Sequence, residues 1–307
     1  MAELTIRAPS LDDLERTVAV LDSYAAERSD HRVTADEVRR WWTAPDFDLD
    51  WQALVAGGDR ELVGYVDAED PNGDGSQLWI DLRVPESGRR LGADARLLGE
   101  MEQRARSHAS EGGVLRGHAN MNDDRTVGLY RERGFEAVRY SFRMEASLAQ
   151  LPAEPRWPDG IDVRAGDPAD SGDVYAAYRE SFADAWGAVE EPYADFLHNW
   201  GVGGDLDASL WFLAVEGGEL AGVALCLPSR GGEDELGWVS VLGVRRPWRR
   251  RGLGRALLLH AFRELRARGK QRVGLGVDAD SPTGAVALYE SVGMRVVNRF
   301  VSLEKPV

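Results

Sequence analysis

The sequence predicts an α+β protein made of two similar domains in tandem, each with a mixed central sheet flanked by helices. Three observations lead to this prediction. Strand-like and helix-like segments follow one another in the same order in both halves of the 307 residues. Matching landmarks lie about 160 positions apart along the chain. A proline-rich segment separates the two halves.

The first half has the pattern strand, two helices, three strands, helix, strand, helix and two closing strands. Apolar runs bounded by turn residues predict the strands, and apolar residues at helical spacing predict the helices. The strands are expected at residues 4–8, 53–56, 62–67, 78–84 and 114–119, with the closing pair within 135–145. One helix is expected to begin at Asp12, and others to cover residues 33–42, 94–108 and 125–133.

The second half repeats this order at nearly constant spacing. The matches are Leu4–Ala8 with Ile161–Ala165, Asp12 with Asp170, Leu82–Val84 with Leu242–Val244, and Leu129–Arg131 with Leu288–Glu290. Such spacing indicates a duplicated domain. Three prolines in Leu151–Pro158 form a stiff connector. One domain is therefore expected at residues 1–150 and the other at 159–307.

The composition limits the classes of function. A net charge of −15 argues against general nucleic-acid binding and against attachment to an anionic membrane. The start of the chain is no signal peptide and no apolar run is long enough to span a membrane, so a cytoplasmic protein is expected. Cys226 is the one cysteine, and its apolar neighbours favour a buried thiol. The five histidines lack metal-ligand spacing, so no metal is expected and His260 is interpreted as structural.

The segment Ser240–Leu257 is the most informative part of the chain. An apolar strand ends at Val244, a turn with five arginines in seven positions follows, and Gly252-Leu253-Gly254 opens a helical pattern. N–H groups at a helix N-terminus lack internal partners and attract anions, and glycine lets the backbone approach a ligand. The segment is therefore predicted to hold phosphate. The third glycine of a dinucleotide fingerprint and the Gly-Lys-Ser/Thr of a Walker loop are missing.

Two motifs in this half resemble the Gcn5-related N-acetyltransferase (GNAT) family. The acyl-CoA signature of the family, Arg/Gln-x-x-Gly-x-Gly/Ala after a strand, corresponds to Arg249–Gly254. Its second landmark, a helix reading Ala-x-x-Leu-Tyr-x-x-x-Gly-Phe or similar, corresponds to Ala285–Met294. A tandem pair whose second copy is intact resembles the mycothiol synthase branch and its actinobacterial relatives. The resemblance implies the GNAT fold in both halves and acetyl-CoA as co-substrate, whereas the arginines alone would also suit a solvated basic face.

The resemblance also implies roles for individual residues. The N–H of Val244 is expected to stabilise the oxyanion of the thioester, and Tyr289 to protonate the leaving thiolate. A core aromatic is the alternative interpretation of Tyr289. Ser281 replaces an asparagine that family members often carry. The predicted cofactor-binding residues are Leu242, Gly243, Val244, Arg249, Arg250, Arg251, Gly252, Leu253, Gly254, Arg255, Ser281 and Tyr289.

The general base departs from the family pattern. Many members carry a glutamate eleven residues before the first residue of the glycine motif, where this chain has Trp238. An indole cannot take a proton from an ammonium group, and Ser240 on the same strand is a poor base. The remaining candidates are a water relay and the acids Glu235, Asp184, Glu190 and Glu191, each of which also suits an ordinary surface position. A cluster of aromatic residues is expected mainly in the core, with some members lining the acceptor pocket: Phe182, Trp186, Tyr193, Phe196 and Trp200.

In the first half the glycine motif is degenerate, because Asp94 stands where the last glycine or alanine belongs. A carboxylate repels pyrophosphate, so the first domain is expected not to catalyse. The sequence thus predicts an acetyltransferase that acts on a primary amine of a small molecule in its second domain, as a monomer or homodimer without nucleic-acid or membrane partners. The rival hypothesis is an acyl-CoA-binding regulatory or scaffolding protein without turnover, which Trp238 and Ser281 favour.

Overall fold

The computed structural model describes residues 4–30, 32–58, 61–188, 192–199, 207–281 and 283–307. It divides into two compact units. Unit 1 contains Met1–Ser141 and Asn298–Val307, and unit 2 contains Phe142–Val297. Each unit has a mixed sheet covered by helices on both faces, so the predicted fold class is confirmed.

Unit 1 is built on the strand order β1-β2-β3-β4-β5-β12, in which β4 and β5 are parallel. Its strands are β1 (Thr5–Arg7), β2 (Ala53–Gly57), β3 (Leu62–Glu69), β4 (Gln77–Arg83), β5 (Val114–Asn120) and the end of β12 (Arg295–Pro306). Its helices are α1 (Leu14–Arg28), α2 (Ala35–Trp42), α3 (Leu49–Gln52), α4 (Glu86–Arg89), α5 (Ala93–His108) and α6 (Asp124–Glu132). The short helices α3 and α4 were not predicted.

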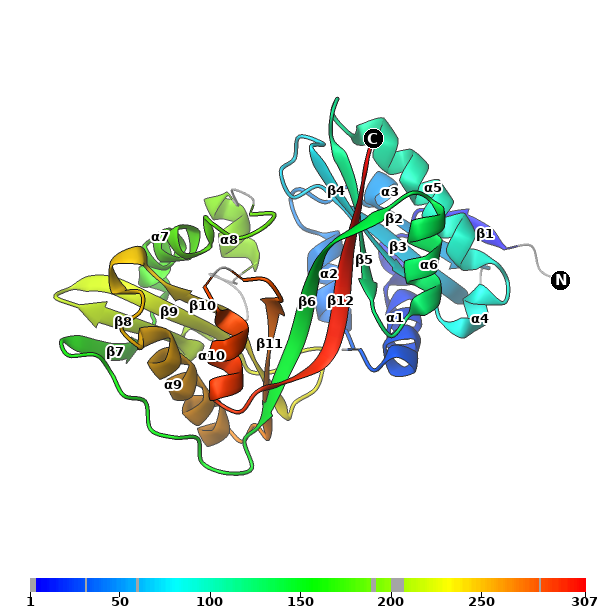
Figure 1. Ribbon diagram of the computed structural model, residues 1–307. Coiled ribbons are helices and arrows are strands. Elements are labelled where there is room, and N and C mark those ends of the chain that lie inside the picture. The colour runs from blue at the N-terminus through cyan, green and yellow to red at the C-terminus, as the bar shows by residue number, and fades with distance from the viewer. Residues whose placement is uncertain (1–3, 31, 59–60, 189–191, 200–206, 282) are drawn as a thin grey trace. The chain divides into compact units, whose positions relative to one another are not determined.

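Unit 2 repeats this arrangement with the strand order β6-β11-β10-β9-β8-β7. Its strands are the end of β6 (Glu136–Ser147), β7 (Ile161–Ala165), β8 (Trp211–Glu216), β9 (Glu219–Leu227), β10 (Leu236–Val244) and β11 (Arg272–Asp278). Its helices are α7 (Ser171–Phe182), α8 (Tyr193–Asn199), α9 (Leu253–Ala267) and α10 (Ala285–Ser291), with a 3₁₀ turn at Arg246–Trp248. Figure 1 shows α7 and α8 on one face of this sheet and α9 and α10 on the other.

Each half ends in one long strand, so the predicted closing pair of strands was wrong. Neither β6 nor β12 has a glycine or proline inside the strand that would turn the chain. The division between the compact units falls within these strands, after Ser141 and after Val297. The last residues of the chain therefore complete unit 1, where Phe300–Pro306 pair with β5 over Val114–Asn120.

Two apolar cores lie on opposite faces of each sheet, because successive strand residues point to opposite sides. In unit 2, the register shift between Val239 and Val241 puts these two residues on opposite faces, so that Val239 packs with Leu257 and other residues of α9, whereas Val241 packs with Val174 and Ala177 of α7. In unit 1, Val301 and Leu303 of β12 join the core under α5 and α6. The end of β12 is therefore part of the packed interior of unit 1.

A matching pair of ion pairs supports the duplication at the level of side chains. Arg7 binds Asp13 through both guanidinium nitrogens at 2.7 Å. Arg164 binds Asp170 in the same way at 2.7 and 2.6 Å. The structure thus aligns Asp170 with Asp13, which corrects the match of Asp170 with Asp12 by one position.

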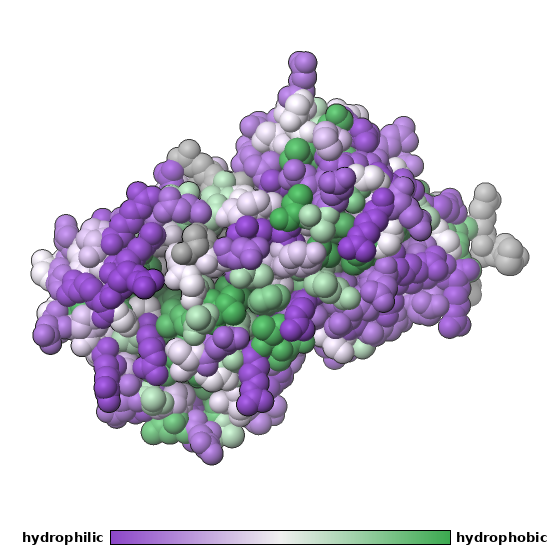
Figure 2. Space-filling model, in the orientation of Figure 1, coloured by the Kyte–Doolittle hydropathy of each residue, from purple (hydrophilic) through white to green (hydrophobic). Residues whose placement is uncertain are grey.

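The face in Figure 2 is mostly hydrophilic, in keeping with the 29% of charged residues. Among the helices that the structure describes, none has the length and apolar character needed to cross a membrane.

Candidate active site

The glycine turn of unit 2 connects β10 to the N-terminus of α9, as the sequence predicted. Gly252 is the residue before the helix and has a left-handed φ of 87°, a conformation that glycine adopts without strain. The N–H of Ala256 makes the first intrahelical bond, to the Gly252 carbonyl at 3.1 Å. The N–H groups of Leu253, Gly254 and Arg255 therefore precede the helical ladder and carry the positive end of the helix dipole.

Most of the arginines around this turn are held by acceptors of their own unit. The partners are Glu180 for Arg245, Asp184 for Arg246, the carbonyls of Val244 and Ser181 for Arg249, and Glu216 for Arg251. Arg250 and Arg255 are exposed, and their side chains have no partner among the residues that the structure describes. Of the arginine side chains in this segment, these two are the ones left to meet an anion.

Glu180 of α7 organises the turn and was not predicted. Its carboxylate accepts from Nε of Arg245 at 2.6 Å and from the backbone N–H of Arg246 at 2.8 Å. The hydrogen bond from Arg245 lowers the pKa of Glu180. Opposite charges so far apart in the chain leave no local pattern, which is why sequence reasoning missed the residue.

The strand β10 is unpaired along much of one edge. It pairs with β9 from Trp238 to Val244, but with β11 only at Leu236, Gly237 and Trp238 within the described residues. A bulge at Ser240 shifts the register between Val239 and Val241. The Ser240 hydroxyl is buried and has no hydrogen-bond partner among the described residues.

The predicted backbone donor lies on this unpaired edge. The N–H of Arg245 donates to the carbonyl of Ala221, which belongs to β9, at 3.0 Å. Backbone groups alternate in direction along an extended strand, so the N–H of Val244 points to the opposite edge. Leu242 shares this orientation, while Gly243 faces β9.

Tyr289 lies on α10 and is 8% exposed. Burial raises the pKa of its phenol to about 12, and its hydroxyl makes no hydrogen bond with any described residue. A Cβ on Gly254 would lie 3.6 Å from both Leu288 of α10 and Val244 of β10. The glycine turn, the helix of Tyr289 and the unpaired strand edge therefore meet around Gly254.

The remaining candidates take structural positions. Ser281 lies in the turn before α10, where its hydroxyl bonds Thr283 at 2.9 Å. Asp184 pairs with Arg246, and Glu235 accepts from Nε2 of Gln271 at 2.7 Å, so both described acids are engaged. Glu190 and Glu191 lie outside the described residues. Trp238 is buried, and the guanidinium groups of Arg143 and Arg230 both contact its ring.

The aromatic residues ahead of the central strands divide between core and surface. Phe196 is fully buried, and its ring lies 5.2 and 5.7 Å from those of Tyr175 and Tyr178. Tyr193 is 40% exposed and its hydroxyl bonds that of Ser171 at 2.9 Å. Phe182 and Trp186 are partly buried, and Trp200 lies outside the described residues.

Two further side chains of unit 2 pack within it: His260 is partly buried, and Cys226 is buried as predicted. His260 packs edge-on against Phe212 at a ring distance of 4.9 Å. Cys226 is buried in the sheet core, and burial raises the pKa of its thiol. Among the described residues, no group of three or more His, Cys, Asp and Glu side chains is placed to hold a metal.

The first copy fills the corresponding positions with its own groups. Asp94 is buried and binds Nε of Arg125 at 2.5 Å. Tyr130 is fully buried, and its hydroxyl donates to the Ile80 carbonyl at 2.8 Å. β4 and β5 pair at five positions, from Gln77–Val114 to Asp81–His118, without a bulge in the register of β4. β4 therefore stays paired with β5 over most of its length, whereas the described part of β10 has no β11 partner beyond Trp238.

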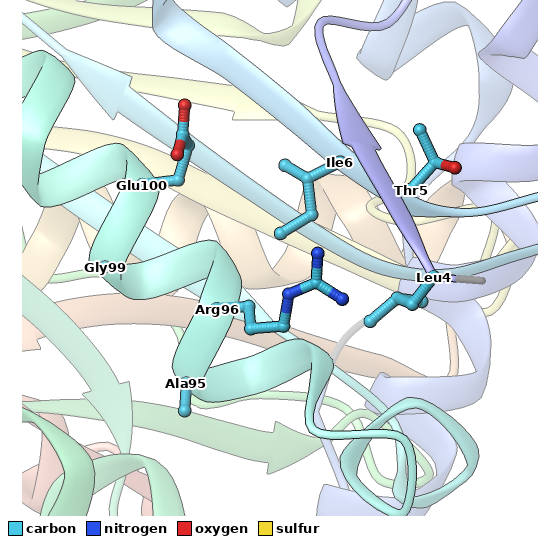
Figure 3. Close-up of a pocket in the computed structure, with 7 residues that line it drawn as sticks. All are labelled: Leu4, Thr5, Ile6, Ala95, Arg96, Gly99 and Glu100. Atoms are coloured by element: carbon cyan, nitrogen blue, oxygen red, sulfur yellow. The ribbon is translucent and has the colours of Figure 1, made fainter.

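Unit 1 also has a hollow that is lined by other residues. Figure 3 shows it between β1 and α5, with Arg96 and Glu100 of α5 beside Leu4 and Ile6. No predicted site residue lines it.

Comparisons with known proteins agree with the duplication. The family model described as "Acetyltransferase (GNAT) family" matches residues 17–135 and 172–294. A mycothiol acetyltransferase from Geodermatophilus obscurus is 31% identical over 248 residues, covering 78% of this chain and 77% of the relative. One from Streptomyces scabiei is 33% identical, covering 76% of this chain and 73% of the relative.

Solved structures resemble the whole chain. A GCN5-related N-acetyltransferase from Sphaerobacter thermophilus has a TM-score of 0.81 at 29% identity, covering 100% of this chain and 96% of that one. A tandem GNAT protein from the clavulanic acid biosynthesis pathway has a TM-score of 0.77 and covers 99% of this chain and 98% of that one. At 18% identity the second likeness concerns the fold alone.

Proposed function

This chain belongs to the GNAT acetyltransferase family, and on that premise we propose that its second copy transfers an acetyl group from acetyl-CoA to a primary amine of a small molecule. Because the family uses acyl-CoA, the proposal adds three points: that the acyl group is acetyl, that the acceptor is a small primary amine, and that the second copy is the catalytic one. The first copy is assigned a structural role.

The observation that carries the proposal is the unpaired edge of β10 beside the N-terminus of α9. Exposed strand groups can pair with the amides of a pantetheine arm, as an added strand would. The helix N-terminus with Arg250 and Arg255 suits the phosphates. Gly254 keeps side-chain atoms away from the backbone there. The residues present therefore fit acetyl-CoA in the second copy.

The proposed chemistry assigns one task to each group. Acetyl-CoA supplies a thioester. The N–H of Val244 donates to the thioester oxygen where negative charge develops. The hydroxyl of Tyr289 gives its proton to the sulfur as the C–S bond breaks, and its pKa of about 12 keeps the phenol protonated at neutral pH. The amine nitrogen forms the new bond to the acetyl carbon.

The amine proton is assigned to water, and solvent returns a proton to the phenolate of Tyr289, so that the step has no net gain or loss of protons. Trp238 carries no basic group, and the carboxylates of Asp184 and Glu235 are already engaged with Arg246 and Gln271. Direct attack then depends on holding the amine and the thioester together, since positioning alone can supply much of the rate enhancement.

Release of free CoA thiol tests the proposal. The purified chain is mixed with acetyl-CoA and a panel of amines, with amines related to mycothiol first because two relatives carry that name. We expect amine-dependent thiol release for at least one small primary amine. Tight binding of acetyl-CoA without release for any amine would instead support the binding protein without turnover.

A further inference from the structure

The two backbone groups of Val244, the last residue of β10, are treated differently by the protein. In an extended strand the N–H and the carbonyl of one residue point to the same edge. The Val244 carbonyl accepts a hydrogen bond from Nε of Arg249 at 3.1 Å. The Val244 N–H has no partner among the described residues. The carbonyl is therefore capped by a side chain, and the N–H is the group left over.

The same guanidinium also binds the end of α7. Nη2 of Arg249 donates to the carbonyl of Ser181 at 3.2 Å. Ser181 lies in the last turn of α7, where carbonyls lack a partner within the helix and a cation is favourable. The Arg249 side chain is 29% exposed, so most of it is enclosed at this junction. Arg249 thus ties the end of β10 to the end of α7.

The peptide between Val244 and Arg245 is fixed on both sides. Its carbonyl accepts from Arg249, and its N–H donates to the Ala221 carbonyl of β9 at 3.0 Å. From α7, Glu180 accepts from Nε of Arg245 at 2.6 Å and from the next backbone N–H at 2.8 Å. The end of β10 is therefore clamped by β9, by α7 and by the first arginine of the glycine motif.

The first copy makes the same contact without an open cofactor site. Nε of Arg89 donates to the Val84 carbonyl at 2.8 Å, and its other nitrogens bind the buried carboxylate of Asp123. The contact from the first motif arginine to the strand end is thus common to both copies. It does not depend on a phosphate, so a ligand is not needed to explain where the Arg249 side chain lies.

We infer that Arg249 is a positioning residue that acts through Val244, and not a ligand of the phosphates; the inference rests on the proposed function. An oxyanion is stabilised only by a donor held at hydrogen-bond distance from the place where charge develops. Beyond Trp238 the described part of β10 has no partner in β11 to hold its end. Without Arg249 the Val244 carbonyl loses its donor, and the N–H of the same residue loses its fixed direction.

Two substitutions of similar shape separate this role from phosphate binding. Nε of arginine and Nε2 of glutamine are both bonded to Cδ, so Arg249→Gln keeps an N–H donor where Arg249→Met has a methyl group. For Arg249→Met we expect kcat to fall by about 10–100-fold, since a misplacement of about 1 Å can cost about 100-fold. The Kd of acetyl-CoA should stay within a few-fold of the wild type. Arg249→Gln should recover most of the lost kcat.

Steady-state kinetics with a turned-over amine and calorimetric titration with acetyl-CoA measure the two quantities in the full chain. Arg268→Met is the matched control, because Arg268 also donates to a backbone carbonyl, that of Ser209 at 3.2 Å, and is 31% exposed. It follows the other end of α9, and its kcat should not change. Arg250→Met removes a side chain assigned to the phosphates and should raise the Kd by at least about 10-fold.

Each outcome is decisive. An unchanged kcat in Arg249→Met, or equal losses in Arg249→Met and Arg249→Gln, overturns the inference and leaves the proposed function intact. A raised Kd with unchanged kcat in both variants would make Arg249 a phosphate ligand and overturns it as well. No turnover by the wild type with any amine contradicts the proposed function and the inference with it.

Circular dichroism checks that the variants are folded. If Arg249→Met is unfolded, Arg249→Lys takes its place, because it keeps the charge but has a methylene at the position of Nε. A reduced kcat is then the expected result and the wild-type kcat the contrary one.

Discussion

The two glycine turns of this chain have the same backbone and opposite surroundings. Gly92 and Gly252 precede their helices with left-handed φ values of 73° and 87°. Two residues later the first copy has Asp94, buried and paired with Arg125, whereas the second has Gly254 with space around it. In the first copy a carboxylate of the protein takes the place beside the helix N-terminus that an anion would need.

The tyrosine and the strand edge next to each glycine turn also differ between the two copies. The hydroxyl of Tyr130 is bonded to the Ile80 carbonyl and its ring covers Gly117, where a Cβ would lie 2.5 Å away. Apart from its chain neighbours, no atom of the described residues lies within 4 Å of a Cβ built on Gly276, the counterpart of Gly117. Buried polar groups need partners. The first copy finds these partners within itself, whereas the strand edge and the phenol of the second copy have none among the described residues and are assigned to the ligand by the proposed function.

Replacing Tyr289 with phenylalanine tests this contrast most strongly. We expect kcat to fall by about 10²–10⁴-fold, the usual contribution of a general acid. The dissociation constant of acetyl-CoA should change little, because the hydroxyl contacts no described residue and its task arises only as the thiolate leaves. Steady-state kinetics and calorimetry measure the two quantities.

Tyr130→Phe is the matched control for activity, with an unchanged kcat as the expected result. An unchanged kcat in Tyr289→Phe would remove the phenol from the chemistry. A large loss in Tyr130→Phe would mean that the first copy contributes directly to turnover.

The anchoring of the first motif arginine provides a second test. Arg89 binds the buried carboxylate of Asp123, with Nη1 to Oδ1 at 2.7 Å, and both side chains are at most 2% exposed. Arg249 bonds the carbonyl oxygens of Val244 and Ser181, and the carboxylate near it, 3.7 Å from its Nη1, is that of the exposed Asp184. Asp123→Asn should lower the free energy of unfolding by about 3–5 kcal/mol, because it leaves a buried charge without its partner. Chemical denaturation measures the change.

This contribution should depend on pH. Burial alone would raise the pKa of Asp123, but the hydrogen bonds from Arg89 hold it at about 2. A carboxyl group whose pKa is lower in the folded than in the unfolded protein stabilises the folded state. This stabilisation is complete above the unfolded pKa of about 4 and is lost as the pH falls toward 2. The gap between wild type and Asp123→Asn should therefore shrink below about pH 4. The control is Glu264→Gln, which breaks an exposed ion pair with Arg268 on one helix and should lower the free energy of unfolding by only about 0.3–0.5 kcal/mol. If Asp123→Asn lost no more stability than this control, the anchoring role of Asp123 would be contradicted.

Gly254→Asp transfers the first copy's residue into the second. The affinity for acetyl-CoA should fall by about 100-fold, since like charges placed together cost several kcal/mol. The fold should tolerate the change, because the nearest atoms lie 3.6 Å from the new Cβ and an acid in the first turn suits the helix dipole. Equilibrium binding and thermal unfolding separate the two effects.

Two companion variants sharpen this result. Gly254→Ala should bind within a few-fold of the wild type, as its methyl group makes only ordinary contacts. The double variant Asp94→Gly/Gly254→Asp should not gain an acetyl-CoA site in the first copy, because β4 and β5 remain paired there. Survival of affinity in Gly254→Asp would place the phosphates elsewhere.

The sequence predicted the parts of this molecule that local patterns encode. Gly252 and Gly254 mark the turn because a left-handed φ and an unobstructed backbone call for glycine. The constant spacing between copies likewise predicted the duplicated fold. Within a copy, the alternation of strands and helices follows from apolar periodicity alone.

Long-range pairing could not be predicted in this way. The residues of β12 pair with β5, as in Glu304 with Arg116, yet their apolar alternation would suit either sheet. Glu180 and Arg245 likewise meet only through the fold. The bulge at Ser240 depends on how β10 pairs with both neighbours, so the unpaired edge that distinguishes the copies became visible only in the structure.

The smallest effect concerns the tyrosine hydroxyls as stabilising groups. Tyr130→Phe removes the bond to the Ile80 carbonyl and should lower the free energy of unfolding by about 0.5–1.5 kcal/mol, the usual net value of one hydrogen bond. Tyr289→Phe removes no bond to any described residue and should cost less than about 0.5 kcal/mol. Denaturant titration of both variants without ligand measures the difference. Equal losses would mean that the Tyr289 hydroxyl already has a partner in the free protein, and it would then not be available to a departing thiolate.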